Sequence, residues 1–356
     1  MTKRIVFTGG GTAGHVTPNI ALIERLRADG WEIHYIGSHD GMEKDLIAKV
    51  PGVAYHAVSC GKLRRYHSWK NLSDPFRVIK GFAESKKLFR AIKPDVVFSK
   101  GGFVSVPVVM AAGKTPVVAH ESDFTPGLSN RIASHFTDRV CVTFEDTLRY
   151  VHGGKGVFTG TPIRPELYRG DRSRALRFTG FSGEKPILLA MGGSLGAQKL
   201  NEMLREILPE LVKTFDIIHL CGKGKLDEAA AREGYKQYEY ITDELPDLFR
   251  AADIVLSRAG ANAVFELLAL NKPAVLVPLP LSASRGDQIL NAKYFEKKGY
   301  ALVVDQDTAT PDELKSAIER LYRERETFAA NMRLDTCADG TETILGLIQE
   351  SAGRAK

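Results

Sequence analysis

Two glycine-rich turns in this chain of 356 residues have the composition of phosphate-binding turns. The first, residues 9–14 (GGGTAG), follows an apolar run and precedes His15, and the second, residues 192–196 (GGSLG), follows another apolar run. Glycines let backbone N–H groups approach an anion where a helix begins, and the hydroxyl of Ser194 would add a donor. Glycines can also serve only a tight change of chain direction, so the turns alone leave both interpretations open.

Two other chemistries fit these turns less well. The first turn matches the dinucleotide pattern G-x-G-x-x-G, but the second predicted strand ends without the acidic residue that grips a ribose, and Asp40 comes late. The second turn matches the serine-hydrolase pattern G-x-S-x-G. The only histidine downstream of Ser194 is His219, inside a predicted strand, so a Ser-Asp-His triad cannot be built.

A paired-aspartate metal site is a third possibility. Asp305 and Asp307 have the spacing of such a pair. Because they lie among turn-forming residues before a capped helix, a solvated loop is favoured. We therefore assign no metal and no cofactor.

The elements that must position these turns are short strands alternating with amphipathic helices. This alternation is typical of parallel sheets covered by helices on both faces, where ligands bind at the carboxyl ends of the strands. Helix 312–324, for example, is preceded by Thr310 and has Glu313 in its first turn, the pattern of a capping box. The expected strands are 4–8, 32–36, 53–58, 95–99, 116–120, 139–143, 156–159, 186–191, 216–221, 238–241, 253–257, 273–277 and 301–304.

Thirteen strands are too many for one open sheet, and the polar, proline-bearing stretch 160–184 is the expected break. We predict an α/β protein of two Rossmann-like domains whose parallel sheets face each other across a cleft. The first domain is residues 1–162, with a C-terminal helix at 336–356 packing back on it, and the second is residues 163–335.

Ordered motifs along nearly the whole chain make it resemble the MurG family. Besides the two glycine turns, the motifs are His120-Glu121, residues 160–164 (GTPIR), 257–266 (SRAGANAVFE) and 288–292 (QILNA). That family consists of peptidoglycan N-acetylglucosaminyltransferases with the GT-B fold. The resemblance implies an inverting transfer of N-acetylglucosamine from UDP-N-acetylglucosamine to the muramyl-pentapeptide carried on undecaprenyl diphosphate.

The resemblance also implies roles for single residues. In the second domain Glu266 would hold the ribose, Ile241 the uracil and Gln288 the sugar. Ser194 and Arg164 would face the donor phosphates, and Ala261 would complete the donor site. In the first domain the acceptor would be bound by residues of the glycine turn and the loop after the fifth strand: Gly11, Thr12, Gly14 and Asp123.

His15 would lie near the reacting hydroxyl, and its imidazole, with an ordinary pKa of about 6.5, suits a proton acceptor. A guanidinium at Arg164 and a helix N-terminus would neutralise the departing UDP. The alternatives stay open: His15 as a helix cap or phosphate ligand, Glu266 as a solvated helical carboxylate and Arg164 as a linker charge.

Two positions depart from the family pattern. The family reads His-Glu-Gln-Asn where this chain has residues 120–123 (HESD), so the carboxylate of Asp123 replaces an amide. Asp287 precedes Gln288 where many members have a neutral or basic residue. These departures leave two alternatives: a GT-B transferase acting on another lipid such as diacylglycerol, or a nucleotide-sugar-binding module without turnover.

Basic residues are concentrated in one segment. Of the net charge of +6, residues 1–160 carry +8 and the remainder −2, and residues 62–93 alone carry +8. Basic residues beside large apolar ones suit an anionic membrane surface, although a helix with its apolar face in the core would have the same pattern. The candidate membrane-contact residues are Trp69, Phe76, Ile79 and Phe82.

No known nucleic-acid-binding module accompanies this segment, so we expect no nucleic-acid partner. No apolar run approaches the roughly 18 residues of a spanning helix, and the N-terminus lacks a signal-peptide pattern. We expect a cytoplasmic protein bound peripherally to the inner face of the cell membrane.

Overall fold

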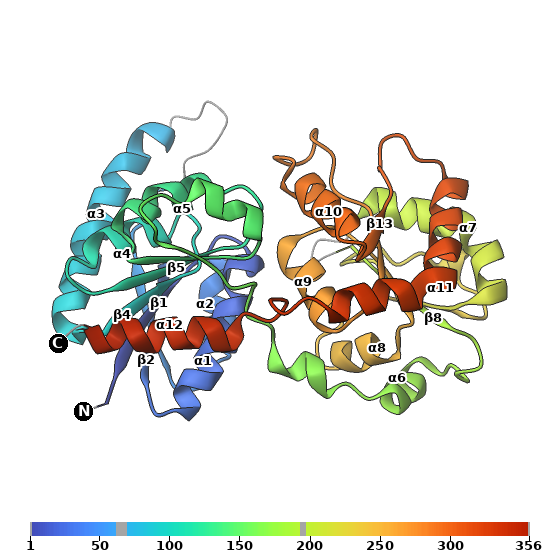
Figure 1. Ribbon diagram of the computed structural model, residues 1–356, viewed down its shortest axis with the longest axis horizontal. Helices are drawn as coiled ribbons and strands as arrows, with labels where there is room; N and C mark the ends of the chain where they lie inside the picture. Colours follow the sequence, from blue (N-terminus) through green and yellow to red (C-terminus); the bar gives the residue numbers. More distant parts are fainter. Residues whose placement is uncertain (1, 62–69, 193–196, 355–356) are drawn as a thin grey trace. The chain divides into compact units, whose positions relative to one another are not determined.

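The computed structural model describes residues 2–61, 70–192 and 197–354, of which residues 70–73 are described by their backbone alone. Trp69 and Ser194, two of the predicted site residues, lie outside the described residues. The chain divides into two compact units: unit 1 is Met1–Arg164 with Asp339–Lys356, and unit 2 is Pro165–Ala338. Each unit is built on its own parallel sheet (Figure 1).

Unit 1 contains a seven-stranded sheet in the order β3-β2-β1-β4-β5-β6-β7. The strands are β1 (Arg4–Thr8), β2 (Glu32–Ser38), β3 (Val53–Val58), β4 (Val96–Ser99), β5 (Val117–Glu121), β6 (Arg139–Val142) and β7 (Gly156–Phe158). The helices are α1 (Thr17–Ala28), α2 (Met42–Ile47), α3 (Lys70–Ile92), α4 (Ser105–Ala111), α5 (Leu128–Ala133) and α12 (Thr341–Arg354).

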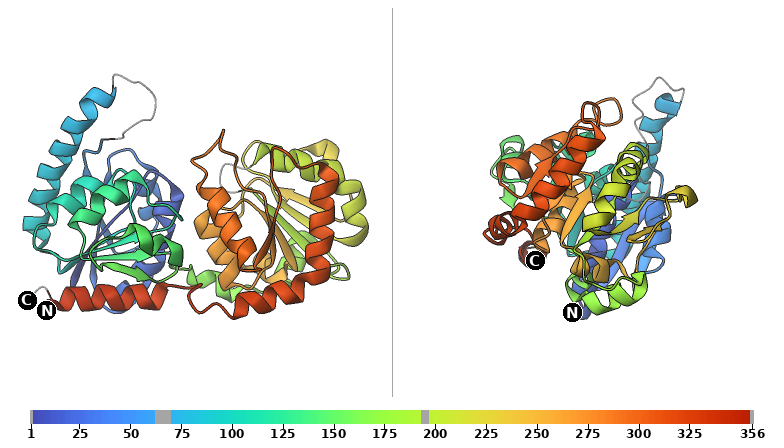
Figure 2. Two further views of the ribbon diagram at one scale, coloured as in Figure 1. Left: turned by 45° about the horizontal axis from the view of Figure 1, so that its top comes forward. Right: turned by 90° about the vertical axis from the view of Figure 1, so that its right-hand side faces the viewer.

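Successive side chains of β1 point to opposite faces of the sheet and belong to two different hydrophobic cores of unit 1. Ile5 and Phe7 pack with α1 and α12, whereas Val6 packs with α3, α4 and α5 on the other face. Figure 2 shows the same two helical layers around the sheet. Strands that are apolar at nearly every position are typical of parallel sheets with both faces covered.

Unit 2 contains a six-stranded sheet in the order β10-β9-β8-β11-β12-β13. The strands are β8 (Ile187–Met191), β9 (Asp216–Leu220), β10 (Tyr235–Tyr238), β11 (Ile254–Ser257), β12 (Ala274–Leu276) and β13 (Ala301–Val303). The helices are α6 (Arg172–Thr179), α7 (Gln198–Thr214), α8 (Leu245–Ala251), α9 (Ala261–Ala269), α10 (Asp287–Lys297) and α11 (Pro311–Arg333). Helices α7 and α11 cover the face that carries Leu188 and Ala190.

The strand order reverses at one point in each sheet. In unit 1 the chain moves outward from β1 to β3 and returns to β4, and in unit 2 it moves from β8 to β10 and returns to β11. The carboxyl ends of the strands at such a reversal are where open α/β sheets bind ligands. The two glycine turns follow β1 and β8, so the topology places each of them at a reversal point.

The predicted α/β class is confirmed, and thirteen strands occur among the described residues in the predicted order. The strand predicted at 238–241 was wrong. Tyr235 pairs with Ile217 and Tyr238 with Leu220, so the strand ends where it was expected to begin.

Two helices differ in extent from the expected ones. The capping box of Thr310 and Glu313 is confirmed, but α11 runs on to Arg333 because Phe328 and Met332 continue its buried face. The C-terminal helix, expected from residue 336, begins at Thr341.

The chain returns to unit 1 through a short pairing before α12. Thr161 forms a parallel bridge with Asp339, and the N–H of Gly340 donates to the Thr161 carbonyl at 2.9 Å. The hydroxyl of Thr341 accepts from the Ile163 N–H at 3.2 Å. These bonds align α12 so that Ile344 and Ile348 are fully buried in the unit 1 core.

We expect Gly340→Ala to weaken the docking of α12. A Cβ on Gly340 would lie 2.4 Å from the Thr159 carbonyl oxygen, and relieving such a clash costs about 2 kcal/mol. Gly346→Ala is the matched control, because nothing lies within 4 Å of its Cβ and alanine favours an exposed helix by about 0.5–1 kcal/mol. Urea denaturation should show opposite changes in the two variants, and equal changes would contradict the docking geometry.

Candidate functional site

The glycine turn after β1 contacts the turn that follows β4. The N–H of Gly10 donates to the Gly101 carbonyl at 3.3 Å. Gly102 has φ +84°, and a Cβ on it would lie 2.2 Å from the Gly10 carbonyl oxygen. Only glycine allows both this backbone angle and this approach, so the reversal point of unit 1 is lined by main chain.

Two buried side chains form hydrogen bonds to the first glycine turn. The sequence pattern indicated neither of them. Glu43, in the first turn of α2, accepts from the Gly11 N–H at 3.2 Å and from the Ser38 N–H at 3.0 Å. The hydroxyl of Tyr35 donates to the Gly9 carbonyl at 2.7 Å, and burial raises the pKa of this tyrosine. In the sequence, Glu43 looks like an ordinary acidic residue in the first turn of a helix, and Tyr35 looks like an ordinary aromatic residue of the core.

These contacts limit what the turn can offer a ligand. The N–H groups of Gly10 and Gly11 already donate to protein acceptors. An anion at this turn would therefore be met by its later part, which contains Thr12 and Gly14. Gly11, although predicted as an acceptor-binding residue, has its N–H directed at Glu43.

His15 ends the short 3-10 turn Ala13–His15, and its ring contacts Thr12. The Nδ1 atom of His15 lies 3.0 Å from the Thr12 hydroxyl oxygen. The Asn19 side chain donates to the His15 carbonyl at 3.4 Å, which ties this turn to α1. For Nε2 to accept a proton, Nδ1 must carry the hydrogen, and the Thr12 hydroxyl is placed to accept it because a hydroxyl both donates and accepts.

Four of the predicted donor-site residues follow strands of unit 2. Ile241 is buried just beyond β10, and Ala261 is the first residue of α9, which follows β11. Glu266 is half-buried on the same helix, and Gln288 lies near the start of α10 after β12. These residues therefore gather at the carboxyl side of one sheet. Arg164 is the last residue of the first segment of unit 1.

A buried arginine organises the loops around these residues. Arg258 directly follows β11, and its Nη1 atom donates to the Val277 carbonyl at 2.9 Å. Its Nη2 atom donates to the Gln306 side chain at 2.5 Å, so one guanidinium joins the segments after β11, β12 and β13. Burial lowers the pKa of Arg258. The sequence showed Arg258 within a motif but offered no role for it.

The loop before α10 is fixed by two further amides. The side chain of Asn291 donates to the Ala259 carbonyl at 3.0 Å, and the Gln288 Oε1 atom accepts from the Leu279 N–H at 3.0 Å. Asp287, which departs from the family pattern, forms an ion pair with Arg285 at 2.7 Å. The carboxylate of Asp287 is thus neutralised by its own loop.

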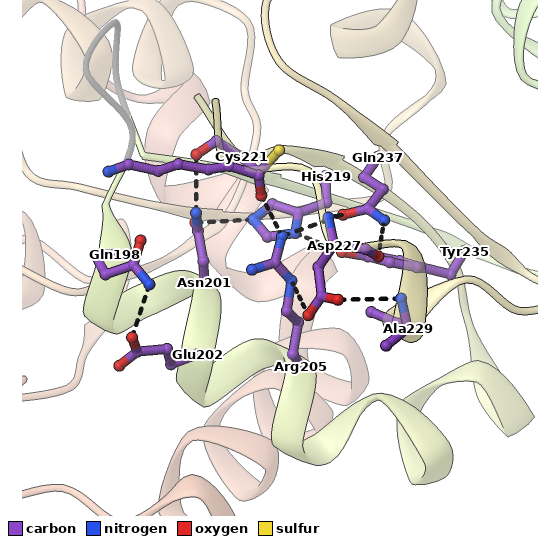
Figure 3. Close-up of polar contacts among 12 residues, drawn as sticks. Gln198, Asn201, Glu202, Arg205, His219, Cys221, Asp227, Ala229, Tyr235 and Gln237 are labelled. Atoms are coloured by element: carbon purple, nitrogen blue, oxygen red, sulfur yellow. Dashed lines mark hydrogen bonds and ion pairs between the residues drawn. The ribbon is translucent and has the colours of Figure 1, made fainter. Parts of the chain in front are cut away.

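The start of α7, beside the second glycine turn, is tied to β9 by buried polar groups (Figure 3). The Asn201 amide nitrogen donates to the Cys221 carbonyl at 2.8 Å, and its Oδ1 atom lies 3.0 Å from His219 Nε2. Because an amide oxygen only accepts, Nε2 carries the hydrogen, and His219 Nδ1 accepts from the Tyr235 hydroxyl at 2.7 Å. Burial lowers the pKa of His219 to about 3, so its ring is neutral. Both ring nitrogens of His219 are thus engaged within the core of unit 2.

A second contact from α7 continues this network. The Nη2 atom of Arg205 donates to the Lys225 carbonyl at 2.6 Å and to the Gln237 side chain at 3.1 Å, and its Nε atom lies 3.7 Å from Asp227 (Figure 3). These bonds hold the segment after β9 against α7. Together with Asn201, they tie the first half of α7 to β9 and to the segment after it.

Asn201→Ala is expected to destabilise unit 2 by about 2 kcal/mol, because it leaves His219 Nε2 and the Cys221 carbonyl buried without partners. Amide hydrogen exchange in the first turn of α7 should become faster. The control is Gln198→Ala on the same helix, whose exposed side chain contacts Glu202 at 2.7 Å. If both variants unfold at the same urea concentration, the network does not anchor α7.

Comparisons with known proteins agree with this geometry. Residues 5–142 match the glycosyltransferase family 28 N-terminal domain, and residues 187–344 match the family's C-terminal domain. A relative from Geobacillus thermodenitrificans is 52% identical over 99% of this chain and 100% of its own length. One from Lachnoclostridium phytofermentans is 54% identical over 98% of this chain and 99% of its own. Both are named UDP-N-acetylglucosamine–N-acetylmuramyl-(pentapeptide) pyrophosphoryl-undecaprenol N-acetylglucosamine transferase.

Solved structures give the same result. Acinetobacter baumannii MurG superposes with a TM-score of 0.78 at 26% identity, covering 98% of this chain and 99% of that one. The calicheamicin glycosyltransferase CalG4 superposes with a TM-score of 0.71 at 17% identity over 99% of both chains, a likeness of fold alone. The predicted GT-B fold class is therefore confirmed, and the chain belongs to glycosyltransferase family 28, within the MurG family of N-acetylglucosamine transferases.

Proposed function

We propose that this protein transfers N-acetylglucosamine from UDP-N-acetylglucosamine to the N-acetylmuramyl-pentapeptide carried on undecaprenyl diphosphate, with inversion at the anomeric carbon. The observation that carries the proposal is the identity of 52% over 99% of the chain with a relative named for this transfer. The placement of a glycine turn at each reversal point supports it, because both substrates contain a diphosphate. The product is the lipid-linked disaccharide precursor of peptidoglycan.

Unit 2 binds the donor in this proposal. Glu266 accepts from the ribose hydroxyls, and Ile241 meets the uracil through its backbone. Because Gln288 uses its Oε1 atom to accept from Leu279, its amide nitrogen supplies the donor to a sugar hydroxyl. The N-terminal end of α9 at Ala261, together with Arg164 and Ser194, offsets the charge that grows on the departing UDP.

Unit 1 binds the acceptor. Thr12 and Gly14 lie in the part of the turn that precedes α1, where N–H groups favour a diphosphate. His15 Nε2 takes the proton of the attacking hydroxyl while its Nδ1–H donates to Thr12. Asp123 follows β5, two strands from β1, where its carboxylate can accept from hydroxyl or amide groups of the acceptor.

Incubation of the protein with radiolabelled UDP-N-acetylglucosamine and the muramyl-peptide lipid should yield labelled lipid disaccharide. His15→Ala is expected to lower kcat by about 10²–10⁴-fold while UDP still binds. Thr12→Val, which removes the oxygen that accepts from the Nδ1–H of His15 in this mechanism, should lower kcat in the same direction, and Thr12→Ser should retain most activity.

Three outcomes would count against parts of this proposal. Labelling of diacylglycerol instead of the muramyl lipid would change the acceptor. Binding of UDP-N-acetylglucosamine without any transfer would reduce the protein to a binding module. Wild-type rates for His15→Ala would remove His15 from the chemistry.

We further propose that α3 attaches unit 1 to an anionic membrane surface. No helix among the described residues has the length and apolar character to cross a bilayer. Phe76 and Ile79 lie three residues apart on α3 and are 74% and 64% exposed. The side chain of Lys80 beside them is 70% exposed. The N-terminal end of α3 projects beyond the neighbouring helices of unit 1 (Figures 1 and 2).

One acid of this basic segment is buried, and the other, Glu84, is half-buried and also lies 3.8 Å from the Lys80 Nζ atom. Asp74 is only 4% exposed, and Glu84 accepts from the Ser59 N–H at 2.6 Å. The outer face of α3 is therefore basic and apolar, as anionic headgroups require. Phe82 differs from the expectation because it is partly buried against the core, with Lys86 Nζ 5.2 Å from its ring centre.

The double variant Phe76→Ser/Ile79→Ser should bind anionic liposomes roughly tenfold more weakly, since each apolar side chain loses the free energy of its burial in lipid. Sedimentation at low and high salt measures this. The control is Leu334→Ser, at a residue of unit 2 that is 80% exposed. Binding that ignores the double variant, lipid charge and salt would contradict the assignment of α3.

A further inference from the structure

A lysine is buried beside the glycine turns of unit 1. Lys100 directly follows β4 and is 1% exposed. Its N–H donates to the Thr8 carbonyl at 2.9 Å, so its backbone continues the pairing of β4 with β1. Burial of an ammonium group is costly unless it is paired, and no step of the proposed reaction uses this one. Its partners therefore indicate what it does.

The ammonium group of Lys100 contacts the end of β5 and the loop that follows it. It lies 2.9 Å from His120 Nδ1 and donates to the Ser122 hydroxyl. His120 Nε2 lies 2.9 Å from the Gly160 carbonyl, which can only accept, so Nε2 carries the hydrogen and Nδ1 accepts from Lys100. Burial, and next the charge of Lys100, lower the pKa of His120 well below its usual value. The histidine is thus a neutral acceptor for a charged lysine.

The neighbouring Glu121 holds the remainder of the same loop. It accepts from the N–H groups of Asp123 at 2.9 Å and Gly127 at 3.1 Å, and from the Asn130 amide at 2.9 Å. A Cβ on Gly101 would lie 2.4 Å from Asn130, so the turn after β4 touches this assembly directly. Residues 121–127 are therefore held by an ammonium group at Ser122 and a carboxylate at Asp123 and Gly127.

The charges of this cluster are mutually dependent. Burial, and next the charge of Asp123, raise the pKa of Glu121 to about 7 against the opposing effects of its hydrogen bonds and of Lys100. Burial lowers the pKa of Lys100 to about 8, against the opposing effects of Glu121, Asp123 and Cys141. Cys141 on β6 stays neutral in this range, because burial raises its pKa to about 12. The ammonium group of Lys100 faces both carboxylates.

We propose that Lys100 is a positioning residue for the acceptor: its ammonium group fixes the loop 121–127 and offsets Glu121 and Asp123, so that a lipid-linked diphosphate can approach that loop. The proposal rests on the function proposed above, in which this side of unit 1 binds the acceptor. It also accounts for the departure at residues 122–123. A hydroxyl at Ser122 accepts from Lys100, and the extra carboxylate at Asp123 is matched by a buried positive charge.

The sign of the pH dependence follows from the lysine. The groups that face it are His120 and Glu121 on β5, Asp123 after β5 and Cys141 on β6. The protonated lysine is the form that fixes the loop. The kcat/KM for the acceptor lipid should therefore fall as pH rises through about 8, while the KM for UDP-N-acetylglucosamine stays constant.

The test is Lys100→Met, which keeps the length of the side chain and removes its charge. We expect kcat/KM for the acceptor to fall about tenfold or more, the alkaline decline to disappear, and the donor KM to change little. The control is Lys49→Met, an exposed lysine after α2. If Lys100→Met does not fold, Lys100→Met/Glu121→Gln removes both buried charges and is measured in the same way.

Wild-type acceptor kinetics with an intact alkaline decline in the lysine variant would overturn the proposal. An equal rise in donor KM would also overturn it, because the effect would then be general. If the wild-type protein transfers to no lipid, the proposed function fails instead. The positioning role is then decided by hydrogen exchange at residues 122–127, which Lys100→Met should accelerate and unchanged exchange would refute.

Discussion

The close approach of two backbone turns at the carboxyl ends of β1 and β4 is the constraint on which the site in unit 1 depends. Gly102 leaves no room for a side chain against the Gly10 carbonyl, and the Gly10 N–H is used in the same contact. The ends of these two strands are consequently lined by main chain, and side chains must reach the site from neighbouring positions of the sheet and its helices. Glu43 does so from α2 and Tyr35 from β2, and Lys100 does so from the end of β4.

In unit 2 the loops at the carboxyl ends of the strands are held together by buried side chains, where unit 1 uses a close contact between backbone turns. At its reversal point Arg258 binds the segments after β12 and β13, and Asn201 ties α7 to the end of β9. A buried guanidinium or amide can satisfy several carbonyls at once, which loops without regular hydrogen bonds need. The loops that carry the proposed donor contacts are thus held by groups that need not touch the donor.

Patterns of apolar residues predicted the strands and their order, because burial on both faces leaves nearly continuous apolar runs. They failed at β10, where Tyr235 and Tyr238 flank two polar residues, Lys236 and Gln237, in an edge strand whose register is set by pairing with β9. Glycine spacing indicated the turn after β1. It could not reveal Glu43, Lys100 or Arg258, because a single charged residue in a sequence gives no sign of being buried.

Burial also changes the meaning of the charge count. The segment 62–93 has a net charge of +8, and the two acids in it are both engaged: Asp74 is buried, and Glu84 accepts from the Ser59 N–H and pairs with Lys80. Around β5 the opposite sorting occurs: a cation is buried beside Glu121 and near the half-buried Asp123, so it offsets part of the repulsion between these acids and the proposed diphosphate. In both places the direction in which a few charged side chains point, and not their number, determines whether an anion can approach the surface. A sequence reports the number, whereas the direction follows only from the packing of α3 and of β4 to β6.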